Sequence, residues 1–157
     1  MSKEKKKIIT PFYFEEPNKE VKFVVPGKPF GKQRPRMSRR GKFTTTYTPK
    51  ETVEYENLVK LSYYTSNCDT KLKGAIKAEI RGVFPVPKGT SNKQREKMIS
   101  GEVKYTKKLD CDNMAKCILD ALNNIAYDDD SQIYELKVSK EYGEIPRVEG
   151  TLKEDNI

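Results

Sequence analysis

The stretch LDCDNMAKCILDALNNIAYDDDSQIYELKV, residues 109–138, contains the strongest signals for the fold. It predicts an amphipathic helix over residues 113–125 with Asp112 as its N-cap, because apolar side chains recur at helical spacing. These side chains are Met114, Ile118, Ala121, Leu122 and Ile125. An acidic turn follows, and residues 132–140 are then typical of a strand. The stretch therefore predicts a helix, a turn and a strand in direct succession.

Strand signals also occur near both ends of the chain and at its centre. KFVVPG, residues 22–27, predicts a short strand that is ended by its proline and glycine. AIKAEIRGVF, residues 75–84, alternates between apolar and charged side chains and is the clearest strand. VEGTL, residues 148–152, is expected to form an antiparallel hairpin with residues 132–140 across the EIP turn. The expected apolar faces carry Ile76, Ala78, Ile80 and Phe84 in the central strand, and Tyr134, Leu136 and Val138 in the strand at 132–140.

Two more helices are expected. The first begins at Pro49, with Thr48 as its cap, and ends near Ser66. The side chains expected to face the core from this helix are Val53, Asn57, Leu58, Leu61 and Tyr64. The second is a short helix with Ser91 as its cap and Gly101 as its stop.

These elements predict an α+β (mixed α/β) protein with the order β-α-β-α-β-β. We expect a single two-layer domain over residues 1–157, with a mixed sheet, two main helices and a folded core at about 19–152 between charged, flexible ends. A chain of 157 residues, 35% of them hydrophobic, suits one core. No run approaches the roughly 18 apolar residues of a membrane span, and the three cysteines form no CxxC pair. A soluble, cytoplasmic protein with reduced thiols is expected.

The basic residues gather in one segment. The chain has 31 Lys and Arg against 23 Asp and Glu, a formal net charge of +8. Residues 27–42, GKPFGKQRPRMSRRGK, are called the basic segment below, and they contain seven basic residues and no acid. The segment predicts a loop that binds DNA phosphates, while a solvated loop of like charge is the alternative. The expected DNA-binding residues are Lys28, Lys32, Arg34, Arg36, Arg39 and Arg40.

Six carboxylates lie between Leu109 and Gln132 of this basic chain: Asp110, Asp112, Asp120, Asp128, Asp129 and Asp130. Such a cluster repels itself unless a cation lies between the groups, so a metal site is the first hypothesis. The chain has no histidine, which excludes serine and cysteine hydrolase triads and histidine-dependent nucleases. Oxygen ligands alone favour magnesium or manganese over zinc. In the alternative interpretation, Asp112 is only a helix cap and Asp110 an exposed loop charge.

Spacing does not show that these acids meet. A helix over residues 113–125 is about 20 Å long at ~1.5 Å per residue, so the acidic turn begins far from Asp112. Lys116 lies one turn from both Asp112 and Asp120. It could pair with either carboxylate, or it could contact a phosphate and stabilise charge that develops there.

Three stretches resemble the RusA family of Holliday-junction resolvases, which is common in phages and prophages. They are GKPFGKQRPR, YTPKETVEYENLV and KKLDCDNMAKCILDALNNIAYDDDSQI, with the pattern D-x-D-N-x-x-K followed by D-D-x-Q. The resemblance implies that Asp110, Asp112 and Asp130 are the catalytic, metal-binding acids, that they converge, and that Lys116 is the catalytic lysine. Asp129 matches the other acid of the family's pair and is a further expected ligand, while Asp128 is an additional acid that leaves the assignment within the turn open.

The resemblance also implies a function. It indicates a Mg²⁺-dependent endodeoxyribonuclease, with Mn²⁺ as a substitute, that cuts four-way branched DNA by paired nicks during recombination and repair. Relatives act as homodimers, and the expected setting is the cytoplasm of a bacterial host, including hosts that carry a prophage. Two alternatives stay open. One is a nonenzymatic nucleic-acid-binding module, and the other is a nuclease of the same chemistry that acts on flaps or other branched DNA.

Overall fold

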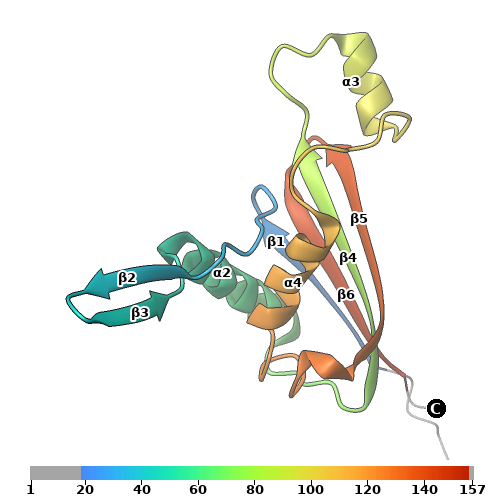
Figure 1. Ribbon diagram of the computed structural model, residues 1–157. Helices are drawn as coiled ribbons and strands as arrows, with labels where there is room; N and C mark the ends of the chain where they lie inside the picture. The colour runs from blue at the N-terminus through green and yellow to red at the C-terminus, as the bar shows by residue number, and fades with distance from the viewer. Residues whose placement is uncertain (1–18, 156–157) are drawn as a thin grey trace, which may run out of the picture.

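The computed structural model describes residues 19–155 (Figure 1). Its strands are β1 Glu20–Pro26, β2 Arg36–Arg40, β3 Phe43–Tyr47, β4 Ala75–Pro85, β5 Ile133–Gly143 and β6 Arg147–Asp155. Its helices are α2 Lys50–Asn67, α3 Asn92–Ile99 and α4 Cys111–Ala121, with a 3₁₀ turn, η2, at Asp130–Gln132. The α+β class and the predicted order are confirmed, with one addition, the β2–β3 hairpin. The flexible N-terminal end expected from the sequence lies outside the described residues.

The main sheet is mixed and has the strand order β1-β6-β4-β5. β1 and β4 both pair antiparallel to β6, whereas β4 and β5 are parallel. The predicted hairpin between residues 132–140 and 148–152 is therefore wrong, because β4 lies between β5 and β6. Residues 144–146 cross the end of β4, where Pro85 pairs with Gly143 and Val83 pairs with Arg147.

Helices α2 and α4 cover one face of this sheet (Figure 1). The predicted apolar face of α4 is confirmed: Met114, Ile118, Ala121 and Leu122 are buried, and Ile125 packs against the core. The helix lies close to the sheet because β4 has a glycine beneath it. A Cβ on Gly82 would lie 2.4 Å from Met114 Sδ. Each large side chain buried in this layer contributes about 1.5–3 kcal/mol to folding.

Helix α2 begins one residue later than predicted and buries a different face. Pro49, not Thr48, occupies its N-cap position, and no side chain bonds to the free N–H groups there. The buried residues are Thr52, Tyr55, Val59, Ser62 and Tyr63. Of the predicted face, Leu58 packs partly buried against the core, whereas Val53, Asn57, Leu61 and Tyr64 are exposed. The rings of Tyr55 and Tyr63 offer the core more area than the side chains of the predicted face. The hydroxyl of Tyr63 is satisfied because it donates to the carbonyl of Thr70 at 2.6 Å.

The short helix α3 begins as predicted, because the Ser91 side chain accepts from the Gln94 N–H. The three cysteines are free, as expected. Among the described helices, none is both long enough and apolar enough to cross a bilayer.

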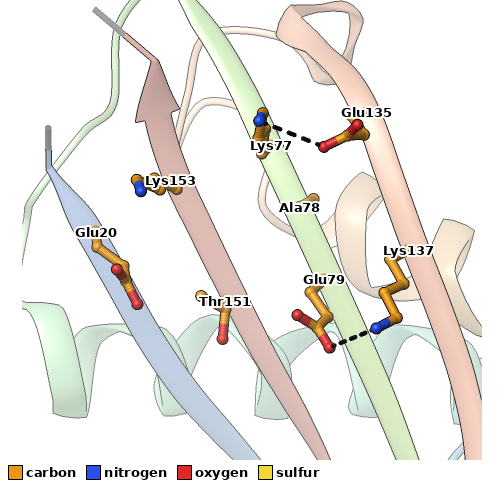
Figure 2. A pocket seen from close by; sticks show the side chains of 8 residues that line it. All are labelled: Glu20, Lys77, Ala78, Glu79, Glu135, Lys137, Thr151 and Lys153. Atoms are coloured by element: carbon orange, nitrogen blue, oxygen red, sulfur yellow. Dashed lines mark ion pairs between the residues drawn. The ribbon is translucent and has the colours of Figure 1, made fainter.

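Within residues 19–155, no helix or strand covers the other face of the sheet, which is charged (Figure 2). Lys77 pairs with Glu135 at 3.7 Å, and Lys137 pairs with Glu79 at 4.0 Å across β4 and β5. The hydroxyl of Tyr134 bonds to Asp155, on the same uncovered face as these pairs. Its predicted place beside Leu136 and Val138 is therefore wrong, because the β4–β5 register shifts between Ile76 and Lys77.

Candidate active site and nucleic-acid interface

The chain enters α4 through a loop that β5 holds in place. Lys140 Nζ donates to the carbonyls of Lys107 at 3.1 Å and Leu109 at 2.8 Å. Asp110 follows with extended backbone angles and occupies the N-cap position, since its carbonyl accepts the Met114 N–H at 3.0 Å. The predicted cap at Asp112 is therefore wrong. Asp112 lies inside the first turn of the helix, so its backbone is helical and it does not occupy the cap position.

The Asp110 and Asp112 carboxylates are both exposed at this end of α4. Asp110 makes no side-chain cap hydrogen bond, and within residues 19–155 no ion pair engages either group. Their negative charge is favoured by the positive end of the helix dipole. The two acids therefore present oxygen atoms that the described part of the chain leaves available to a cation.

Residues 31–35 of the basic segment lie against the side of α4. Lys32, Gln33, Arg34 and Pro35 line a hollow of about 360 Å³ together with Asn113 and Lys116. Lys116 is exposed and forms no ion pair with Asp112 or Asp120 among the described residues. Its ammonium group is therefore available for a phosphate in this hollow.

Two contacts hold the basic segment in this position. A Cβ on Gly31 would lie 2.1 Å from Leu109 Cδ1 and 2.7 Å from Asn113 Nδ2, so the backbone can approach α4 only because this residue is glycine. On the other side, Gln33 Nε2 donates to Glu51 Oε2 at 2.8 Å, which joins the segment to α2. The segment is therefore held between the two main helices.

Lys32 bonds to the last turn of α4. Its Nζ lies 2.9 Å from Asp120 Oδ2, and this hydrogen bond is the main reason why the pKa of Lys32 is raised. A direct phosphate contact by Lys32, as predicted, would compete with Asp120. The Lys32–Asp120 pair was missed from the sequence, although Asn113, Lys116 and Asp120 at positions i, i+3 and i+7 indicate one helix face.

The acidic turn folds back onto the same end of α4. The helix ends at Ala121, four residues before the predicted end, and Asn124 has a φ of 65° in the turn that follows. Asp130 then donates its backbone N–H to Asn123 Oδ1 at 2.9 Å. Burial raises the pKa of the Asp130 carboxyl, and the adjacent Asp120 carboxylate raises it further. Asp130 therefore neighbours Asp120 at the C-terminal end of α4.

The other two acids of the turn have structural partners. Asp129 Oδ2 accepts the Ser131 N–H at 3.1 Å and forms a capping box with Gln132, and these hydrogen bonds lower the pKa of Asp129. Asp128 Oδ1 lies 2.6 Å from Lys71 Nζ, which lowers the pKa of Asp128. One oxygen of each carboxylate is thus engaged within the protein.

The structure places the predicted metal ligands at two ends of one helix. Asp110 and Asp112 lie at its start, and Asp130 lies beside Asp120 at its end. At a rise of ~1.5 Å per residue, Asp120 is about 12 Å along the helix from Asp112. Within the described range, no three acidic or cysteine side chains gather closely enough to hold an ion. The carboxylate oxygens suit magnesium chemically, but their arrangement does not form a closed site. The metal-binding set of Asp110, Asp112, Asp130 and Asp129 therefore stays a prediction.

The second half of the basic segment is not a loop. Residues Arg36–Arg40 and Phe43–Tyr47 pair as a two-stranded antiparallel hairpin with Gly41, at a φ of 60°, in its turn. Three consecutive threonines before Tyr47 were the strand signal that the prediction missed, since β-branched residues favour strands. Arg34, Arg36, Arg39 and Arg40 are exposed, while Lys28 lines a different hollow beside Lys88 and Lys107.

Comparison with known proteins identifies relatives. The family model described as "Endodeoxyribonuclease RusA" matches residues 26–153, which include the basic segment, α4 and the acidic turn. The "Uncharacterized protein YqaN" of Bacillus subtilis (strain 168) is 38% identical to the chain over 136 residues. That similarity covers 85% of the present chain and 96% of the relative.

Proposed function

Because the chain belongs to the RusA endodeoxyribonuclease family, we propose that it is a Mg²⁺-dependent endonuclease that cuts four-way DNA junctions by paired nicks during recombination and repair. One observation in the structure carries the proposal. Residues 31–35 of the basic segment are held against the face of α4 that bears Lys116, Asp110 and Asp112 are exposed at the start of that helix, and Asp120 and Asp130 neighbour each other at its end. Phosphate binding and metal binding would thus share one surface.

The residues have separate roles in this proposal. Lys28, Arg34, Arg36, Arg39 and Arg40 contact the DNA backbone, and Lys32 joins them where DNA displaces it from Asp120. Lys116 holds the scissile phosphate and stabilises the charge that develops on it. Asp110 and Asp112 would hold the magnesium ion at the start of α4, and Asp130, with Asp129 in support, would join them only in a conformation that closes the distance of about 12 Å between the two ends of the helix. When bound, such an ion supplies a polarised water and neutralises phosphate charge, and Mn²⁺ would substitute for it.

Cutting two strands of one junction at the same time requires two active sites. A homodimer with two-fold symmetry provides them, since each subunit then meets one of two equivalent strands. We propose this assembly for the present chain.

The test is Mg²⁺-dependent nicking of a synthetic four-way junction, a flap and a linear duplex. The wild-type protein is expected to nick the junction in two strands, and Asp112→Asn is expected to lose that activity. Asp69→Asn is the matched control, because it removes the same charge from an exposed residue just after α2, distant from α4 in sequence. Equal nicking by the wild-type protein and Asp112→Asn would overturn the assignment.

A nonenzymatic binding module is the second candidate. It is favoured by the finding that no three acids gather as an ion site among residues 19–155. That candidate predicts binding to branched DNA without cleavage in Mg²⁺ or Mn²⁺. If flaps rather than junctions are cut, the same chemistry acts on another branched substrate.

A further inference from the structure

The β2–β3 hairpin extends away from the rest of the protein (Figure 1). Its two strands form a separate sheet. Within the described chain, each of these strands makes extensive contacts only with the other. It contributes no residue to the hydrophobic core formed by the described part of the chain. The hairpin is therefore not explained by a role in stabilising the fold.

The register gives the hairpin two different faces. Arg36 pairs with Tyr47 and Arg40 pairs with Phe43, with a Ser–Thr pair between them. Because directly opposed residues share a face, both Arg–aromatic pairs lie on one side. Met37 belongs to the opposite side, where it pairs with Thr46. One face thus carries two flat guanidinium groups and two aromatic rings.

These aromatic side chains are unusually exposed. Phe43 is 78% exposed and Tyr47 is 48% exposed. Apolar side chains that cluster on an isolated projection indicate a binding surface. The hairpin is positively charged, because residues 36–47 include three arginines and a lysine but no acid, so a negatively charged partner is favoured. A partner with phosphates and flat apolar faces matches both features, and nucleic acid has this chemistry.

We infer that the Arg36/Tyr47 and Arg40/Phe43 face stacks on the base faces that a DNA branch point leaves exposed, and this inference rests on the proposed function. Aromatic rings and guanidinium planes both stack on bases. In a continuous duplex the base faces are covered by their neighbours, whereas a branch point exposes them. The hairpin therefore discriminates branched from linear DNA, while its charges bind both.

The location of the hairpin supports this role. Arg34 and Pro35 line the hollow beside Lys116, and β2 begins at the next residue. Five residues of strand at ~3.3 Å each extend about 16 Å from that point. DNA bound beside α4 would thus reach the hairpin within about five base steps.

The test measures binding in EDTA, so that cleavage plays no part. A four-way junction with 2-aminopurine at the branch point is compared with a linear duplex of the same sequence. The variant Phe43→Leu/Tyr47→Leu keeps apolar side chains but removes the rings. It is expected to bind the junction at least about fivefold more weakly and the duplex within about twofold of wild type. The wild-type protein should change the 2-aminopurine emission, and the leucine variant should not.

Two controls separate stacking from a loss of hairpin structure. Met37→Ala alters the opposite face of the same hairpin and should behave like the wild-type protein. Phe43→Tyr/Tyr47→Phe exchanges the rings and should retain junction preference. The inference is overturned if the leucine variant keeps the wild-type ratio of junction to duplex affinity, or if the ring-exchange variant loses it.

Other outcomes also distinguish the hypotheses. If the wild-type protein shows the emission change in EDTA but cuts no DNA in Mg²⁺, the proposed nuclease fails and the stacking inference stands. If the protein makes paired nicks in Mg²⁺ but causes no emission change, the nuclease proposal stands and the stacking inference fails. Ring-dependent sedimentation with anionic lipid vesicles, without ring-dependent junction binding, would assign the hairpin to a membrane and overturn the inference.

Discussion

Lys32 Nζ donates to Asp120 Oδ2 at 2.9 Å, and this ion pair joins the basic segment to the last turn of α4. Asp120 in turn neighbours Asp130, so Lys32 is the ion-pair partner of one member of this pair of acids. Most of the basic segment is free to bind phosphate, but Lys32 also neutralises charge inside the protein.

Lys32→Ala is therefore expected to lower stability. The variant leaves Asp120 beside Asp130 without its counter-charge, and both side chains of the ion pair are partly buried. The expected loss is about 0.5–1 kcal/mol in the free energy of unfolding, measured in urea. Lys42→Ala is the control, because Lys42 is exposed in the hairpin turn. Equal stability of the two variants would contradict a structural role for the ion pair.

Gly31→Ala is expected to cost about 1–3 kcal/mol of stability, because the new Cβ would overlap Leu109 Cδ1 and Asn113 Nδ2. A double-mutant cycle with Leu109→Ala identifies the cause. Removal of Cδ1 makes room for the Cβ, so the double variant should be more stable than the sum of the single losses predicts. Strict additivity in thermal unfolding would show that the Leu109 contact is not the origin of the effect.

The salt dependence of DNA binding should report on the exposed arginines. Arg34→Gln/Arg36→Gln is expected to weaken binding and to reduce the slope of log K against log salt by about 2, one unit for each phosphate that is no longer neutralised. Lys77→Gln/Lys137→Gln removes the same charge from the uncovered face of the sheet, where both lysines pair with glutamates (Figure 2). That control should leave the slope nearly unchanged. An equal change in both variants would show that the slope depends only on the net charge of the protein and not on phosphate contacts by Arg34 and Arg36.

Glu149 should contribute to the acid sensitivity of the fold. Burial opposes its ionisation, but hydrogen bonds from Arg147 and Arg81 outweigh burial and lower the pKa of Glu149. A carboxyl whose pKa is lower in the folded state stabilises the protein above its unfolded pKa of about 4.3, and this contribution is lost as pH falls through the folded pKa. Urea titrations should show a steeper loss of stability below about pH 4.3 in wild type than in Glu149→Gln. Parallel curves would exclude this contribution.

The local patterns of the sequence predicted the elements well. The alternation over residues 75–84 and the apolar spacing from Met114 to Leu122 both correspond to buried faces in the structure. These signals are local because side chains two residues apart in a strand, or four apart in a helix, lie on one face. The acids of the candidate site and the family were likewise evident from residue order and spacing.

Contacts between residues that are distant in the sequence could not be predicted from such local patterns. The insertion of β4 between β5 and β6 depends on strand pairing across more than 50 residues, and the buried face of α2 depends on which rings best fill the space against β1 and α4. The pairing of Asp130 with Asp120, and of Asp120 with Lys32, required the turn after α4 and the close approach at Gly31. Residue types and spacing thus identified the chemical groups. Packing alone placed those groups next to one another, since it balances backbone geometry, burial and charge over the whole chain.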